Sequence, residues 1–260
     1  MPIFKKGAKD DPTKYRPVSL TSVLCKVMES LIKDSLKTFL DKKEAVSNYQ
    51  YGFTDGRSCL TNLLESLESW TQALDERFGI DVLYLDYRKA FDSVPHKRLL
   101  EKLKLYGING KLLRWIQSFL AARLMRVGIR GRFSDWIVLS GVPQGSVLGP
   151  LLFSLFVSDL PDRIKNSMRM FADDVKMWNV IRTDAGDDSL QEDLNSLARW
   201  SSKWLLKLNS ICKVMHIGHD TCTEYHITDD DGNSNVIEQI TEEKDLGVYI
   251  TADLKPSTQC

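Results

Sequence analysis

Three aspartates stand where they could bind divalent cations and take part in phosphoryl chemistry. Asp173 and Asp174 are adjacent within MRMFADDVKMW, a run whose other residues are mostly apolar. Adjacent carboxylates repel each other and burial disfavours the charged form of each, so the pair indicates a solvated turn or a bound cation. Asp86 ends a second apolar run, IDVLYLD, which predicts a buried strand. From the residues alone, a plain hairpin turn at Asp173–Asp174 and a helix N-cap at Asp86 stay open.

Together, the three aspartates predict a two-metal site on two adjacent strands. Carboxylate oxygens are the hard ligands that Mg²⁺ prefers, and Mg²⁺ usually takes a few of them together with substrate phosphates. Two such ions about 4 Å apart clamp the attacking and leaving oxygens of an in-line displacement. The sequence has no Gly-rich Rossmann or P-loop signature, so a nucleotide would have to be bound through metal and side chains.

The elements that would position these residues alternate between helix and strand, which predicts an α+β architecture. Apolar residues at helical spacing predict helices over about 22–40, 60–74, 95–106, 109–121, 151–159 and 189–208. Short apolar runs predict strands over about 80–86, 213–218, 224–228 and 246–250, with hairpins over 123–141 and 168–178.

The composition is that of an ordinary globular protein without net charge. The chain has 260 residues, enough for one large domain or two subdomains, and 35 basic residues balance 35 acidic ones. Basic residues nevertheless gather in the middle of the chain, at Lys97, Arg98, Lys102, Lys104, Lys111, Arg114, Arg123, Arg126, Arg130 and Arg132. A local basic surface could follow a phosphate backbone, although a solvated helix face explains the same charges.

The five cysteines are scattered and odd in number, which argues against a disulfide framework and for a reducing, intracellular compartment, whether nuclear or cytoplasmic. No signal peptide and no apolar run near the roughly 18 residues of a membrane span is visible. Five potential soft metal ligands lie close together in sequence: Cys212, His216, His219, Cys222 and His226. Their spacing matches no zinc knuckle, and KVMHIG predicts a strand in which these side chains diverge.

The order and spacing of several motifs resemble the reverse transcriptases, and more narrowly the polymerases of non-LTR (LINE-type, Jockey-like) retrotransposons. The central motifs are DYRKAFD, SGVPQGSVLGP and FADD; KKGAKDDPTKYRPVSLTSVLCKVMESLI and QYGFTDGRSCLTNLL precede them, and WSSKWLLKLN and KDLGVYI follow. The resemblance covers nearly the whole chain. It implies a right-hand polymerase fold, with an antiparallel palm sheet flanked by helices. The implied segments are fingers over 1–79, palm over 80–255 (109–135 partly finger or insert) and a tail over 256–260, with the thumb absent.

The resemblance also implies the metal ligands. Asp86 and Asp173 match the family's two metal-binding aspartates. Asp174 is the neighbour whose metal role is less direct, and the Tyr87 carbonyl is a further ligand. The implied cofactor is a pair of Mg²⁺ ions, for which Mn²⁺ is a possible substitute.

Other residues match nucleotide-binding positions of the family. Phe91 stands at the steric gate, where a bulky ring under the sugar clashes with a ribose 2′-hydroxyl and favours dNTPs, although simple core packing would also explain it. Gln144 resembles the residue that touches the incoming nucleotide. Gly141 and Gly145 let the backbone approach a ligand closely, although GVPQGS also fits a helix-start turn that binds nothing.

The remaining implied contacts are weaker because the sequence departs from the family pattern near them. Arg16 and Arg57 are candidates to grip the triphosphate, but Thr54 stands where relatives often have Arg. Relatives tend to read N-x-x-K-C after the last helix, with the Lys as a possible general acid. Here Lys213 follows Cys212, and a one-residue slip in a strand turns a side chain to the opposite face.

The implied reaction is RNA-directed DNA synthesis, in which a primer 3′-hydroxyl attacks a dNTP and releases pyrophosphate. The implied partners are an RNA template, a DNA primer and dNTPs, with no membrane and an open oligomeric state. The alternative is a truncated, catalytically inactive remnant that acts at most as a nucleic-acid-binding module. The intact aspartates favour the enzyme, whereas the missing thumb and the displaced Lys213 favour the remnant.

Overall fold

The computed structural model describes residues 2–4, 7–11, 14–43, 45–121, 123–129, 132–135, 137–138, 140–182, 188–209, 211–219, 223–228 and 233–255. The chain forms two compact units, each built from two separate stretches of sequence. The helical unit comprises the described residues of Met1–Val46 and Lys89–Val157, and the sheet unit those of Ser47–Arg88 and Ser158–Cys260.

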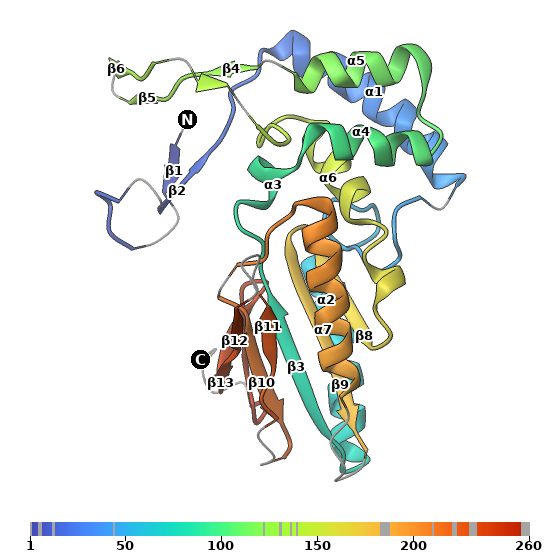
Figure 1. Ribbon diagram of the computed structural model, residues 1–260, viewed down its shortest axis with the longest axis vertical. Helices are drawn as coiled ribbons and strands as arrows, with labels where there is room; N and C mark the ends of the chain where they lie inside the picture. The colour runs from blue at the N-terminus through green and yellow to red at the C-terminus, as the bar shows by residue number, and fades with distance from the viewer. Residues whose placement is uncertain are drawn as a thin grey trace. The chain divides into compact units, whose positions relative to one another are not determined.

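A five-stranded mixed sheet with the strand order β13-β10-β3-β9-β8 forms the centre of the sheet unit. Its strands are β3 (Gly79–Leu85), β8 (Ser167–Phe171), β9 (Asp174–Ile181), β10 (Lys213–Ile217) and β13 (Glu238–Ile240). β10 and β13 run parallel, and the other neighbours run antiparallel. Helix α7 (Ser189–Trp204) lies in front of the sheet in Figure 1 and α2 (Cys59–Asp75) behind it.

Side-chain alternation along β3 decides which residues face each helix. Ile80 packs with Trp70 of α2 in the buried apolar core. Asp81 and its cross-strand partner Asn179 are on the other face, where Asn179 Nδ2 donates a hydrogen bond to Ser189 Oγ at the start of α7 (3.3 Å). The α7 face of the sheet therefore carries a polar group within its central strand.

The sheet unit also contains short elements: β11 (His226–Thr228), β12 (Ser234–Val236), β14 (Glu242–Asp245), β15 (Val248–Thr251) and the 3-10 turn η2 (Pro161–Arg163). Two ion pairs join β14 to the main sheet. Lys176 Nζ lies 2.5 Å from Asp245 Oδ2, with both side chains less than a tenth exposed, and Lys213 Nζ lies 2.6 Å from Glu243 Oε2. The β14–β15 hairpin is thus attached to β9 and β10 by charge as well as by packing.

The helical unit contains α1 (Val23–Asp41), α3 (Ala90–Ser93), α4 (His96–Leu105), α5 (Gly110–Leu120) and α6 (Gly149–Val157). Its short strands are β1 (Pro2–Phe4), β2 (Tyr15–Pro17), β4 (Leu124–Met125), β5 (Gly128–Ile129), β6 (Arg132–Phe133) and β7 (Ile137–Val138). β1 pairs with β2, β4 with β7, and β5 with β6. The last two pairings confirm the hairpin predicted over 123–141. Residues 130–131 lie outside the described residues.

Lys102 of α4 is not part of the basic surface predicted for this region. Its side chain is buried, its Nζ donates a hydrogen bond to the Phe156 carbonyl, and the ammonium lies 4.8 Å from the centre of the Phe156 ring. Lys102 therefore packs in the core of the helical unit and is not available at the surface. Arg130 lies outside the described residues.

Local signals account for the helix starts. Ser22 caps α1 by accepting a hydrogen bond from the Cys25 N–H, and Ser58 and Thr61 form a capping box at the start of α2. The predicted α+β class is confirmed. No helix in the described part of the chain combines the length and the apolar character needed to cross a bilayer.

Candidate active site

Asp173 lies in the two-residue turn that joins β8 to β9. Phe171 pairs with Asp174 across this turn, and Ala172 takes a left-handed backbone conformation with φ +57°. The side chain of Asp173 is half-buried and that of Asp174 is exposed. The predicted hairpin with FADD at its turn is therefore confirmed.

Gln50 holds this turn through both ends of its buried amide. Its Oε1 accepts hydrogen bonds from the N–H groups of Ala172 and Gly52, both at 2.8 Å, and its Nε2 donates to the Ala172 carbonyl at 3.3 Å. Gly52 lies so close that a Cβ there would be 2.3 Å from the Ala172 nitrogen. A left-handed residue that is not glycine costs free energy and persists only where its surroundings fix it. The QYGF segment supplies that support, a role that the sequence analysis missed.

Asp86 follows β3 at the same edge of the sheet as the FADD turn. Leu85 of β3 stands opposite Val175 of β9 in an antiparallel register, so Asp86 and Asp174 are the next residues of the two strands in that direction. Asn209 supports Asp86 twice: its Nδ2 donates to Asp86 Oδ2 at 3.0 Å, and its N–H donates to the Asp86 carbonyl at 2.7 Å. The structure thus brings the predicted aspartates to one edge of one sheet.

Tyr87 is buried beside them. Burial raises the pKa of its phenol well above the ordinary value, so the ring stays neutral. Tyr87 forms an isolated antiparallel bridge with Leu208, and the two backbone hydrogen bonds at this bridge are made by the flanking residues. Neither bond uses the Tyr87 carbonyl, the group that the resemblance implies as a metal ligand.

The donor chemistry at this edge fits a hard divalent cation. Asp86, Asp173 and Asp174 offer carboxylate oxygens, and Tyr87 offers a carbonyl oxygen, which are the ligand types of Mg²⁺ and Mn²⁺. Among the described residues, the side chains that already lie close enough to share one ion are different ones. They are Asp81 of β3, His216 of β10 and His219, which follows β10.

Lys213 begins β10, and its ammonium is paired with Glu243 at 2.6 Å. The neighbouring Cys212 is buried, and burial raises the pKa of its thiol to about 11. The Cys212 thiol donates a hydrogen bond to the Asn209 carbonyl at 3.2 Å. A general-acid role for Lys213 therefore requires its ammonium to exchange Glu243 for substrate.

Arg57, predicted to grip a triphosphate, has contacts within the sheet unit. Its guanidinium donates to the Asn48 backbone carbonyl and to Asn48 Oδ1 (3.2 Å), and it lies 4.7 Å from the centre of the Tyr51 ring. These contacts stabilise the loop between Asn48 and α2. Phosphate binding by Arg57 stays a prediction.

The other predicted nucleotide-binding residues lie in the helical unit. The Phe91 ring stacks on Phe153 with the ring centres 4.5 Å apart. The Gln144 carbonyl accepts a hydrogen bond from the Ser19 N–H at 2.8 Å, and Arg16 is exposed on β2. Packing fixes the Phe91 ring and a backbone bond fixes the segment that carries Gln144.

Two glycines and one buried acid shape the GVPQGS segment. Gly141 has φ +71°, and a Cβ there would lie 2.1 Å from a backbone oxygen; Gly145 has φ +94°. The buried Glu29 of α1 accepts hydrogen bonds through Oε2 from the N–H groups of Val147 and Leu148, at 2.8 and 3.0 Å. Glu29 thus fixes the end of this segment. The residues around Glu29 in the sequence did not predict this role.

The predicted divergence of the histidines in KVMHIG and the residues after it is wrong for one pair. Gly218 takes φ +74° just after β10, and ring nitrogens of both His216 and His219 reach the Asp81 carboxylate. Cys212 and His226 are not members of this group. Cys222 lies outside the described residues.

Comparison with known proteins agrees with the motifs. The sequence model of the family described as "Reverse transcriptase (RNA-dependent DNA polymerase)" matches residues 3–228. The chain is 33% identical over 224 residues to the "Probable RNA-directed DNA polymerase from transposon BS" of Drosophila melanogaster. It is 32% identical over 219 residues to the "RNA-directed DNA polymerase from mobile element jockey" of the same organism. Each match covers 80% of this chain, which spans about a quarter (24%) of the length of each relative.

Solved structures share the fold at much lower identity. Apo telomerase from Candida tropicalis superposes with a TM-score of 0.59 at 11% identity, covering 88% of this chain and 41% of the telomerase. Telomerase from Candida albicans in complex with a fragment of telomeric RNA gives a TM-score of 0.54 at 12% identity, covering 89% and 38%. The α+β arrangement with its mixed sheet is therefore a fold that these telomerases share.

Proposed function

The chain belongs to the reverse transcriptase family, and on that premise we propose that it carries the catalytic part of an RNA-directed DNA polymerase. The observation that carries the proposal is the shared sheet edge, where Asp86 follows β3 and Asp173 and Asp174 stand at the start of β9. The proposed substrates are an RNA template, a DNA primer and dNTPs. The telomerase relative bound to an RNA fragment supports an RNA partner for this fold.

In the proposed mechanism, Asp86, Asp173 and the Tyr87 carbonyl would hold two Mg²⁺ ions, which Mn²⁺ could replace, and Asp174 would add negative charge beside them. When bound, the ions supply the Lewis-acid chemistry that activates the primer 3′-hydroxyl and stabilises the departing pyrophosphate. Asn209 orients the Asp86 carboxylate through its hydrogen bond to Oδ2. Groups held in place before the reaction need no rearrangement as charge develops, which lowers the barrier.

The finer assignments belong to the same proposal. The sheet unit contains most of the palm, and residues 1–79 contribute the fingers in the right-hand description of polymerases. Phe91 serves as the steric gate against ribonucleotides, Gln144 and Gly145 contact the incoming nucleotide, and Arg16 and Arg57 contact its phosphates. The family resemblance supports these five roles.

The alternative is a remnant that binds nucleic acid without extending it. The observation that favours it is the Lys213–Glu243 ion pair, which engages the candidate general acid. A positioned general acid contributes roughly 10²–10⁴ in rate, so this pairing would slow the reaction without removing the metal-dependent part.

Primer extension separates the two functions. The chain is incubated with poly(rA)/oligo(dT), dTTP and Mg²⁺, beside an Asp173→Ala variant of the same preparation. The polymerase proposal expects extension by the unchanged chain and none by the variant. Binding of the hybrid without extension above the variant would reject the polymerase and support the nucleic-acid-binding remnant.

A further inference from the structure

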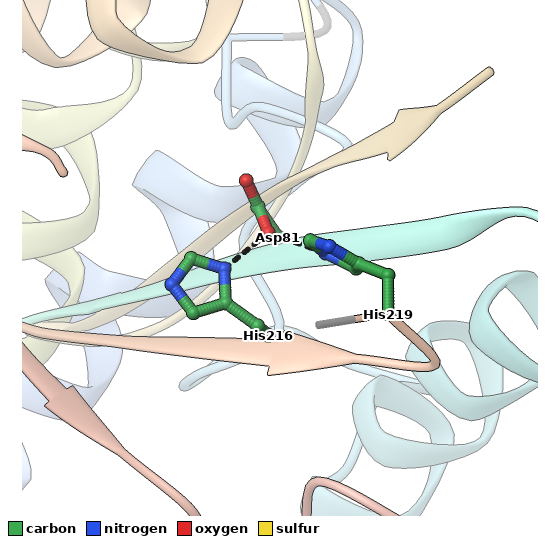
Figure 2. A group of neighbouring side chains, drawn as sticks. All are labelled: Asp81, His216 and His219. Atoms are coloured by element: carbon green, nitrogen blue, oxygen red, sulfur yellow. Dashed lines mark hydrogen bonds and ion pairs between the residues drawn. The ribbon is translucent and has the colours of Figure 1, made fainter. Parts of the chain in front are cut away.

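We propose that Asp81, His216 and His219 form a site for a divalent transition-metal ion, with Zn²⁺ as the best match, apart from the candidate polymerase centre. One carboxylate oxygen and two imidazole nitrogens lie within 4.8 Å of one another (Figure 2). Two imidazoles with one carboxylate form a donor set typical of Zn²⁺ sites that leave a position for water. The oxygen donors at Asp86 and Asp173 instead favour Mg²⁺.

The two rings converge on a single atom. His216 Nδ1 lies 2.5 Å from Asp81 Oδ1, and His219 Nε2 lies 2.9 Å from the same oxygen. Figure 2 shows the rings on either side of the carboxylate, and their planes are 78° apart. A cation between them would use both ring lone pairs and the carboxylate charge at once.

Two glycines allow His219 to reach this position. Residues three apart in a regular strand point to opposite faces, but Gly218 takes φ +74° and turns the chain after β10. A Cβ at Gly79 would lie 2.3 Å from His219 Cδ2, so the ring occupies the space that a side chain at that position would fill. The fold therefore leaves room for this imidazole beside β3.

The carboxylate is buried and held in one orientation. Asp81 has no exposed surface, and Tyr225 Oη donates to its Oδ2 at 2.6 Å. Tyr225 thus plays the part of the outer partners that orient metal-binding carboxylates.

A metal ion in this group would connect three parts of the sheet unit. Its ligands would come from β3, from β10 and from His219, which follows the turn at the end of β10. Asp81 lies on β3, five residues before Asp86, which follows that strand. The ion would therefore stabilise the strand that leads to the candidate active site.

Cobalt titration tests the site in the full chain after treatment with a chelator. Co²⁺ bound with imidazole ligands at low coordination number gives visible d–d bands, whereas six-coordinate Co²⁺ on oxygen ligands absorbs weakly. We expect these bands with one Co²⁺ per chain, and we expect Zn²⁺ to abolish them. His219→Ala and Asp81→Asn should each weaken binding at least about tenfold, since even outer partners of metal ligands contribute that much.

Matched controls distinguish this site from the polymerase centre. His226→Ala removes an exposed histidine outside the group, and Asp173→Ala removes a candidate polymerase ligand; both should keep the bands. Circular dichroism of each variant checks its fold. Absence of the bands in the unchanged chain, or bands retained in both His219→Ala and Asp81→Asn, would overturn the proposal. Because no step requires nucleotide transfer, a chain that binds Co²⁺ but extends no primer would reject only the polymerase.

Discussion

Gln50 supports the Asp173 turn by bonding the backbone of Ala172 on both sides. We expect Gln50→Ala to lower the free energy of unfolding by about 1–3 kcal/mol, because two buried N–H groups and one carbonyl would then have no partner. Primer extension should slow as Asp173 loses its fixed position. Gln50→Glu keeps the acceptor and loses the donor, so its stability and rate should fall between those of Gln50→Ala and the wild type.

Chemical denaturation and single-turnover extension measure these effects. Gln72→Ala is the matched control, because Gln72 is exposed on α2 and its side chain bonds Glu76, the residue that follows the helix. Wild-type stability and rate in Gln50→Ala would show that the turn is held by other interactions.

Phe91 gives a second prediction at the residue scale. If its ring excludes the ribose 2′-hydroxyl, Phe91→Val should raise ribonucleotide incorporation relative to deoxynucleotide incorporation by about tenfold or more, as small changes in pocket shape do. Paired extension assays with dNTPs and rNTPs measure the ratio. Phe133→Val, which changes an exposed ring, is the control. An unchanged ratio in Phe91→Val would contradict the steric-gate role and indicate that Phe91 only packs on Phe153.

Sequence reasoning predicted that Asp86 and the Asp173 turn lie on adjacent strands, and the strand register agrees. It could not assign Gln50 or Glu29, since their partners lie more than a hundred positions away along the chain. It separated His216 from His219 because strand alternation was assumed beyond the point where Gly218 ends it.

At the element scale, the buried ion pair between Lys176 of β9 and Asp245 of β14 gives the clearest energetic prediction. Asp245→Ala should destabilise the fold by about 3–5 kcal/mol, because it leaves an uncompensated ammonium in the interior. Lys176→Met combined with Asp245→Leu should recover most of that stability, since an apolar pair of similar volume needs no charge compensation. Thermal and urea unfolding would test this; a double variant as unstable as Asp245→Ala would contradict it.

Most helix boundaries were predictable from caps and breakers, but the helix predicted over 189–208 ends at Trp204, because Leu205 takes a left-handed conformation. The covered face of a helix was not predictable. The apolar stripe of α1 is a strong helical signal, yet Val23, Leu24 and Leu31 are exposed while Leu36 and Leu40 are buried. Periodicity reports that a helix forms, but tertiary packing decides which apolar residues are covered.

At the scale of the whole molecule, the compact units interleave along the chain. The helical unit combines residues 1–46 with 89–157, so its parts are separated by α2 and β3 of the sheet unit. The fingers and palm segments implied by the resemblance follow sequence order instead. Composition does not change where the chain passes from one unit to the other, so these boundaries could not be read from the sequence.

The uneven distribution of basic residues gives a prediction about nucleic-acid binding by the whole molecule. Lys111 and Arg114 are exposed on α5, and reversing both to Glu should weaken binding of an RNA/DNA hybrid. The slope of log affinity against log salt should become shallower by about 0.9 for each phosphate that the variant no longer neutralises. Reversal of the exposed Arg199 and Lys203 on α7 is the control. Equal weakening in both variants would indicate attraction that depends on net charge alone.

The central claim is that Asp86 and Asp173 form the catalytic edge of the sheet, and single-turnover extension of an RNA-templated primer in Mg²⁺ tests it most directly. Asp86→Asn and Asp173→Asn should each reduce the rate by at least about 10²-fold, the scale on which removal of one charge-stabilising group acts. Asp174→Asn should have a smaller effect, and Asp75→Asn, at an exposed carboxylate of α2, should retain the wild-type rate. Extension that persists in Asp86→Asn and Asp173→Asn at the rate of Asp75→Asn would contradict the account.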